Sequence, residues 1–139
     1  MPEQTKRRKL SWAERRQVYA KCGEHCAYCG APLRYEDMQV DHVKSLRTGG
    51  PDTIDNMLPA CRSCNYRKDT LDIENFRRSI EAFPRVLMRD SVTYKNAVRY
   101  GLVIPAPGPV KFYFEKLAEA ASAEEEQRNA APIYNIAIS

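Results

Sequence analysis

Hydrophobic residues recur at helical spacing in several parts of the chain, and polar residues mark where those parts begin. Ser11 followed by Glu14 is a capping box, which predicts a helix that continues to about Lys21. Asp72 opens a second helix, whose apolar residues lie at i, i+3, i+7 and i+10: Ile73, Phe76, Ile80 and Phe83. A third helix is predicted over residues 91–100, and Gly101 ends it.

The middle of the chain has a different pattern. Residues 38–43 alternate between apolar and polar, which is typical of a short strand, and residues 55–60 form a second extended segment. The loop 48–52 separates them, and residues 62–68 read as a short helix. This order of strand, loop, strand and helix among longer helices indicates an α+β fold.

The C-terminal part of the chain combines proline-containing segments with a helix-prone end. Pro84 interrupts the helical pattern, with a further turn at residues 86–88, and three prolines between residues 105 and 109 indicate an extended linker. Residues 110–114 have the composition of a strand, and residues 118–131 predict an exposed helix or a disordered tail. We therefore expect three regions: a basic N-terminal arm at 1–10, a domain with flanking helices at 11–101, and a linker with an acidic tail at 102–139.

Charge is distributed unevenly over the 139 residues, whose formal net charge is +4. Residues 1–100 hold 19 Lys and Arg against 13 Asp and Glu, whereas residues 101–139 hold 3 against 5. A basic body with an acidic tail suits a polyanion such as nucleic acid. The basic run at residues 6–9 reads either as a solvated terminus or as an arm that neutralises phosphates.

Four of the five cysteines form two Cys-x-x-Cys pairs, the spacing of a closed tetrahedral site for structural zinc: Cys26, Cys29, Cys61 and Cys64. Cys22 is left over and reads as a small, partly buried residue. His25 reads as a surface neighbour, since four thiolates complete the tetrahedron. The pairing of cysteines, with no apolar segment at the start, favours a reducing, cytoplasmic setting. No run of 18 or more apolar residues predicts a membrane span.

An acid, a histidine and two amides follow one another within or beside the segment that the cysteine pairs enclose: Asp41, His42, Asn56 and Asn65. Together with Gly49-Gly50, Asp55-Asn56-Met57-Leu58 and the run from Cys61 to Lys68, they resemble the HNH endonuclease family. The likeness covers roughly residues 11–83. It implies a ββα-metal (HNH) core with structural zinc, flanked by several α-helices.

The resemblance also implies roles for these residues. His42 would be the general base, Asn56 would hold the strand and loop geometry that orients it, and Asp41 and Asn65 would bind a catalytic Mg²⁺ or Mn²⁺. The family's final histidine is Asn65 here, and related nucleases with asparagine at this position are active. Oxygen ligands of this kind suit hard cations. Candidate phosphate contacts are the basic residues Arg62, Arg67, Lys68, Lys44 and Arg47, for which a solvated surface is the competing interpretation.

Three functions are compatible with this pattern. The first is a metal-dependent endonuclease that cuts DNA, with partners of the kind found in phage, packaging or bacterial defence systems. The second is an HNH-fold regulator or inhibitor that binds nucleic acid or protein without cutting. The third is a zinc-ribbon binding module, which would require neither Asp41-His42 nor magnesium.

Overall fold

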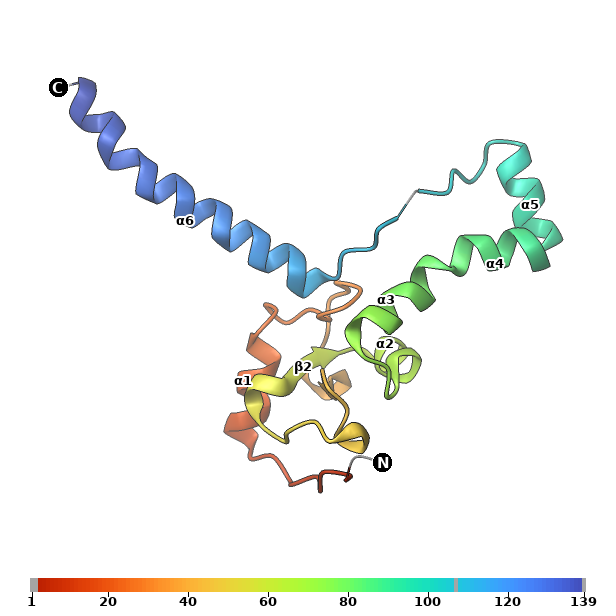
Figure 1. Ribbon diagram of the computed structural model, residues 1–139, viewed down its shortest axis with the longest axis horizontal. Helices are drawn as coiled ribbons and strands as arrows, with labels where there is room; N and C mark the ends of the chain where they lie inside the picture. The colour runs from red at the N-terminus through yellow and green to blue at the C-terminus, as the bar shows by residue number, and fades with distance from the viewer. Residues whose placement is uncertain (1–2, 107, 139) are drawn as a thin grey trace. The chain divides into compact units, whose positions relative to one another are not determined.

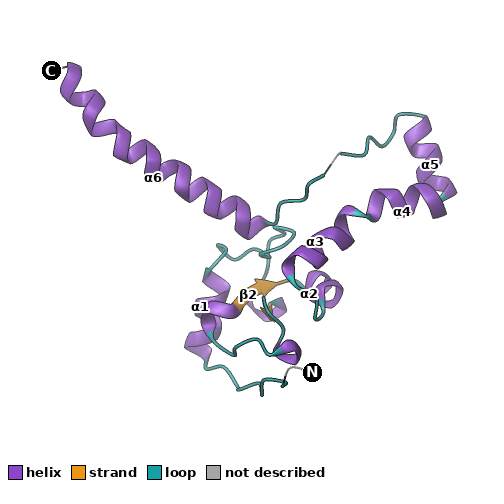
Figure 2. Ribbon diagram, viewed as in Figure 1, coloured by secondary structure: helices purple, strands orange, loops and turns teal. Residues whose placement is uncertain are grey.

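The computed structural model of the protein describes residues 3–106 and 108–138, with side chains described as far as residue 130 (Figure 1). The helices are α1 (Trp12–Ala20), α2 (Arg62–Lys68), α3 (Ile73–Glu81), α4 (Phe83–Asp90), α5 (Val92–Arg99) and α6 (Tyr113–Ile138). Two strands, β1 (Gln39–His42) and β2 (Met57–Ala60), pair as a small antiparallel sheet (Figure 2). The predicted α+β fold class is confirmed.

Side-chain caps account for the beginnings of three helices. At α1, the Ser11 hydroxyl accepts the N–H of Glu14, and the Glu14 carboxylate accepts the N–H of Ser11, both at 3.1 Å. Asp72 caps α3 by accepting the N–H of Asn75 at 2.7 Å, and Ser91 caps α5 in the same way. These contacts satisfy backbone donors that no helical carbonyl reaches.

Two local predictions differ from the structure in part or in full. The helical pattern is interrupted near Pro84 as expected, since α3 ends at Glu81, but the segment that follows is a full helix, α4, rather than a single turn. Pro84 lies in the first turn of α4, where its missing N–H costs nothing. Residues 110–114 do not form a strand, since α6 begins at Tyr113. The N–H groups of Tyr113 and Phe114 donate instead to the carbonyls of Tyr28 and Ala27, at 3.1 and 2.8 Å.

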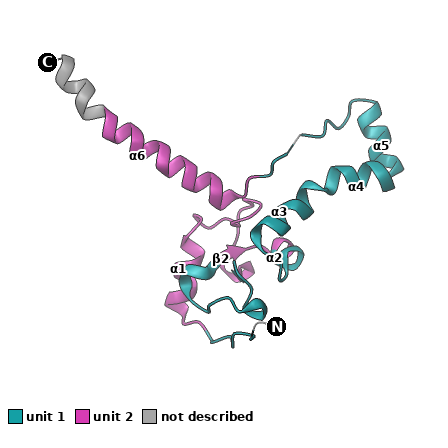
Figure 3. Ribbon diagram, in the orientation of Figure 1, with its two compact units in different colours: residues 1–9, 41–57, 65–110 teal, residues 10–40, 58–64, 111–139 magenta. Residues whose placement is uncertain are grey.

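The chain divides into two compact units, each drawn from three segments (Figure 3). Unit 1 comprises residues 1–9, 41–57 and 65–110, and unit 2 comprises residues 10–40, 58–64 and 111–139. Unit 1 buries Met57 and Phe76 together with the charged residues Asp41 and Lys68. The linear division into residues 1–10, 11–101 and 102–139 stays a prediction.

Unit 2 is built around an aromatic cluster beside the first cysteine pair. The Tyr28 and Phe112 rings meet edge to face with centroids 5.3 Å apart, and the Phe112 and Phe114 rings stack at 6.2 Å. Phe112 is buried although it precedes a long exposed helix. Within the described part of the chain, every helix is too short or too polar to span a membrane.

Candidate active site

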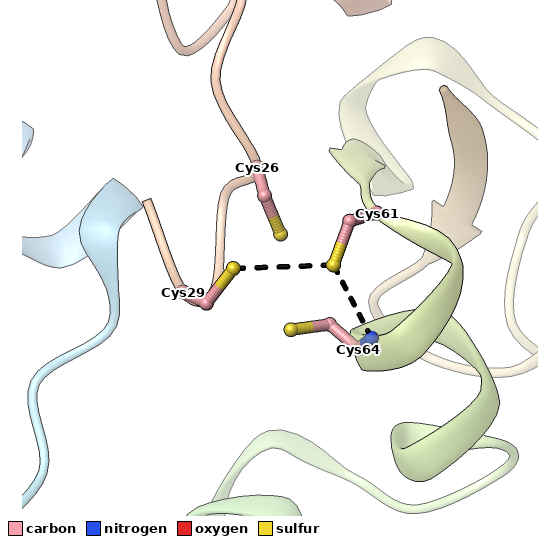
Figure 4. A group of neighbouring side chains, drawn as sticks. All are labelled: Cys26, Cys29, Cys61 and Cys64. Carbon is pink, nitrogen blue, oxygen red and sulfur yellow. Dashed lines mark hydrogen bonds between the residues drawn. The ribbon is translucent and has the colours of Figure 1, made fainter. Parts of the chain in front are cut away.

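The four paired cysteines converge in unit 2, as their spacing predicts. The sulfur atoms of Cys26, Cys29, Cys61 and Cys64 all lie within 4.8 Å of one another (Figure 4). Zinc–sulfur bonds of about 2.3 Å place tetrahedral sulfurs about 3.8 Å apart. The Cys29 and Cys61 sulfurs are 3.9 Å apart, so the cluster fits a zinc ion.

Hydrogen bonds and burial within the cluster shift the pKa values of its cysteines in opposite directions. The backbone N–H of Cys64 points to the Cys61 sulfur at 3.4 Å. A hydrogen bond from the Cys64 thiol lowers the pKa of Cys26 well below its usual value, whereas the same bond raises the pKa of Cys64. His25 lies outside the cluster, and its Nδ1 is 2.7 Å from the Gly23 carbonyl. Cys22 is a buried free thiol.

The predicted base, His42, is buried in unit 1 against a carboxylate. Its Nε2 lies 2.8 Å from Oδ1 of Asp52, and the two side chains are only 6% and 8% exposed. Burial favours a raised pKa for Asp52, but hydrogen bonds from the Arg8 backbone and from the His42 ring outweigh it and lower this pKa. Asp52 is therefore an ionised carboxylate at neutral pH.

Asp52 is itself held by the N-terminal segment. The Arg8 N–H donates to Oδ2 of Asp52 at 2.6 Å, and the Arg8 Nε donates to the Asp52 carbonyl at 3.2 Å. A further bond joins the Thr5 N–H to the Leu46 carbonyl at 2.8 Å. Residues 5–8 are thus bound to the loop that follows His42, rather than being a frayed terminus.

Asp41, the predicted metal ligand, lies in a buried ion pair with Lys68. The Lys68 Nζ is 3.1 Å from Oδ2 of Asp41 and donates to the His42 carbonyl at 3.0 Å. The Lys68 side chain is fully buried. Its predicted role as a phosphate contact is therefore corrected, because an ammonium enclosed with a carboxylate is not available to a phosphate.

Asn56 ties together the two sides of the loop that follows β1. Its Oδ1 accepts the Lys44 N–H, while its Nδ2 donates to the carbonyls of Lys44 and Pro51, each at 2.9 Å. The Asn56 carbonyl accepts the Val43 N–H at 2.8 Å. The Asn56 amide therefore joins the Lys44 and Pro51 backbones of the loop that follows β1.

The same loop turns at two glycines for different reasons. Gly49 adopts the left-handed conformation, with φ of 87°. Gly50 is buried against the backbone, and a Cβ added to it would lie 1.9 Å from the Lys44 carbonyl oxygen. The close approach leaves no room for a side chain at residue 50.

The remaining predicted site residues lie on α2 and on the loop. Asn65, the other predicted metal ligand, is half-buried on α2 directly after Cys64, and among the described residues its side-chain amide has no hydrogen-bond partner. Four predicted phosphate contacts are exposed: Arg62, Arg67, Lys44 and Arg47. The Arg67 guanidinium lies over the Phe83 ring, 5.1 Å from its centroid. Only the cysteines form a group of three or more metal-binding side chains among the described residues.

The part of the chain that forms these contacts matches a protein-family model. The model of the HNH endonuclease family matches residues 26–75, the stretch that includes all four cysteines, Asp41, His42 and Asn65. Residues 26–75 belong to the HNH endonuclease family. The HNH segment thus contains both the sulfur cluster and the buried His42–Asp52 and Lys68–Asp41 pairs.

Two known proteins are similar to parts of the chain. The CRISPR-associated endonuclease Cas9 of Corynebacterium diphtheriae is 36% identical over 44 residues, which is 31% of this chain and 4% of that protein. The crystal structure of the Type II-C Cas9 enzyme from Actinomyces naeslundii matches 75% of this chain and 12% of its own, with 20% identity and a TM-score of 0.46. The chain therefore spans only a small part of either relative.

Sequence reasoning missed Asp52 and Arg8. Asp52 lies in a Gly-Gly-Pro-Asp segment, where an aspartate is an ordinary turn residue, and nothing local links it to a histidine ten positions earlier. Arg8 is 44 residues from its partner. The one available signal was that a buried histidine needs a partner for its ring nitrogen.

Proposed function

We propose that the HNH segment is a metal-dependent endonuclease site that hydrolyses DNA phosphodiester bonds. The observation that carries the proposal is a histidine next to an aspartate, with its Nε2 held by a second carboxylate, inside a segment that matches a nuclease family. His42 is the general base, and Asp41 and Asn65 are the ligands of a divalent cation. Asn56 positions the loop.

The donor set fits a hard cation. Asp41 offers carboxylate oxygens and Asn65 an amide oxygen, the donors that Mg²⁺ and Mn²⁺ prefer. The Asp41 oxygens already face the Lys68 ammonium at 3.1 Å, so the fold accommodates positive charge at this position. A bound divalent cation would supply charge neutralisation at the phosphate and the leaving oxygen.

His42 would take a proton from a water molecule as that water attacks phosphorus. The new bond joins the water oxygen to phosphorus, and the bond from phosphorus to the 3′ oxygen breaks. The proton moves to the ring nitrogen that Asp52 does not hold, and the leaving oxygen takes a proton from solvent. A neutral imidazole ring nitrogen is a suitable acceptor for this proton.

The exposed cations are proposed as phosphate contacts: Arg62, Arg67, Lys44 and Arg47. Each would release counterions from DNA, so binding should weaken steeply as salt rises. They carry no base-reading geometry of their own, which suits low sequence specificity or specificity supplied by partners. A phage, packaging or defence setting follows from the same resemblance.

Plasmid cleavage tests the proposal. Supercoiled plasmid incubated with the protein and Mg²⁺ or Mn²⁺ is expected to be nicked or linearised, and His42→Ala should lower the rate about 100-fold or more, as for the loss of a general base. His25→Ala, at the other histidine of the chain, is the matched control and should cut normally. Equal rates for wild type and His42→Ala would contradict the proposal.

One observation favours the alternative, an HNH-fold regulator that binds without cutting. Lys68 places an ammonium on the carboxylate that a divalent cation would need. In that case the protein would shift a labelled duplex in a binding assay but leave plasmid intact with either metal. Plasmid binding without cutting would therefore support the regulator function over the nuclease function.

A further inference from the structure

The contact between Asp52 and His42 has a chemical direction. A carboxylate can only accept hydrogen bonds, and Oδ1 of Asp52 lies 2.8 Å from Nε2 of the ring. Nε2 must therefore carry the hydrogen. The neutral ring then has its lone pair on Nδ1, and among the described residues Nδ1 has no hydrogen-bond partner.

The second oxygen of Asp52 is also committed. The Arg8 N–H donates to Oδ2 at 2.6 Å, so each carboxylate oxygen accepts one donor. The Arg8 Nε donates to the Asp52 carbonyl, and the Thr5 N–H donates to the Leu46 carbonyl in the same loop. The N-terminal segment thereby fixes the rotation of the Asp52 carboxylate.

We propose that Asp52 is a positioning residue that locks His42 as its Nε2–H tautomer, and that the backbone of Arg8 holds Asp52 for this task. The lone pair of Nδ1 can then accept the proton of the attacking water, and the carboxylate stabilises the imidazolium that forms. A buried carboxylate beside a general base can orient the base and stabilise its protonated form when the carboxylate is already held in place before the reaction. The inference rests on the proposed role of His42 as the base.

Asp52→Asn separates this role from simple loop support. The amide has one oxygen, and the Arg8 N–H needs it, so the NH₂ group is left to face Nε2. The ring must then accept at Nε2 and place its hydrogen on Nδ1. An asparagine that replaces a histidine-bound aspartate is known to leave geometry intact while imposing the wrong tautomer.

The experiment is histidine nitrogen NMR on the full-length, zinc-loaded protein at pH 8, without added divalent metal. Wild type should show a protonated Nε2 and an unprotonated Nδ1 for His42, and Asp52→Asn should show the reverse. Asp55→Asn, the same change at an exposed carboxylate of the same unit, should leave the spectrum unchanged. An Nδ1–H ring in wild type, or an unchanged tautomer in Asp52→Asn, overturns the inference.

Arg8 provides a second, independent variant. Adding Arg8→Pro to Asp52→Asn deletes the N–H that claims the amide oxygen, which lets the amide turn and restores the Nε2–H form. Arg8→Ala keeps that N–H and should restore nothing. Restoration by both substitutions or by neither overturns the part assigned to the Arg8 backbone.

Plasmid cleavage with the same proteins tests the proposed function and the role of Asp52 separately. Asp52→Asn should lower kcat by about 100-fold to 10,000-fold with little change in KM, because the tautomer affects only the chemical step. If wild type cuts nothing, the proposed function fails, while the NMR still decides the tautomer. If Asp52→Asn shows the reversed tautomer and cuts at the wild-type rate, the positioning role fails although the nuclease stands.

Discussion

Lys68 shows how much one residue differs from its appearance in the sequence. On a short helix among other basic residues it resembles a phosphate contact, yet its ammonium is fully buried with the Asp41 carboxylate. A buried ion pair contributes little net stability, but removing one partner leaves an uncompensated charge. The pair is therefore a point where a single substitution should have a large effect.

We expect Lys68→Met to lower the free energy of unfolding by about 3–5 kcal/mol, because it leaves the Asp41 carboxylate buried without the Lys68 ammonium. Adding Asp41→Asn should recover much of the loss, since the amide needs no counter-charge. Urea unfolding of the zinc-loaded protein measures both. Lys95→Met, at an exposed lysine of the same unit, should change the value by less than about 0.5 kcal/mol.

At the scale of single residues, the sequence predicts contacts that follow from regular spacing. It does not predict contacts between residues that lie far apart in the chain. The four cysteines converge because Cys-x-x-Cys pairs leave few other arrangements. The bond from Arg8 to Asp52 joins residues 44 apart, and no local pattern encodes it. Lys68 was predicted to be an exposed phosphate contact because its charge alone does not indicate which face of α2 is buried.

At the scale of elements, helix ends were predicted well where side chains cap them. Ser11 and Asp72 act locally, so the starts of α1 and α3 follow from the sequence. The start of α6 does not, because the N–H groups of Tyr113 and Phe114 bond to carbonyls of residues 28 and 27, far away in the chain. Tertiary partners overrode the strand composition of this segment.

The loop between β1 and β2 provides an element-scale prediction at Gly50. Gly50→Ala places a carbon 1.9 Å from the Lys44 carbonyl oxygen, so the backbone must move, at a cost of about 1–3 kcal/mol. Because Asn56 bonds to the same Lys44 backbone, cleavage should also fall. Thermal unfolding and plasmid cleavage measure the two effects.

Gly101→Ala is the matched control for Gly50→Ala. Gly101 has φ of 74° and no atom within 4 Å of the added carbon, so only backbone strain of about 1 kcal/mol is expected. Cleavage should be unchanged. If Gly50→Ala behaved like Gly101→Ala in both assays, close packing at Gly50 would not matter.

At the scale of the whole molecule, the two compact units divide the chemistry. Unit 2 holds the sulfur cluster, and unit 1 holds the His42–Asp52 and Lys68–Asp41 pairs. The chain runs from Cys64 of unit 2 directly to Asn65 of unit 1 within α2. Cys64, a proposed zinc ligand, and Asn65, a proposed ligand of the catalytic ion, are therefore consecutive residues of one helix.

We expect the purified protein to contain one zinc per chain, and Cys61→Ser to lose the metal and unfold at a lower temperature. Structural zinc in small modules contributes on the order of 10 kcal/mol to folding. Elemental analysis and calorimetry test this prediction. Cys22→Ser, at the buried cysteine outside the cluster, should retain one zinc, and a stable zinc-free Cys61→Ser protein would contradict the assignment.

The attachment of Thr5 and Arg8 to the loop has a practical consequence for recombinant work. A purification tag or fusion partner joined just before Thr5 would end only a few residues before Arg8, whose N–H binds the Asp52 carboxylate. Bulky or charged additions there would disturb the residues that hold it, and a loss of cleavage could then be mistaken for an inactive protein.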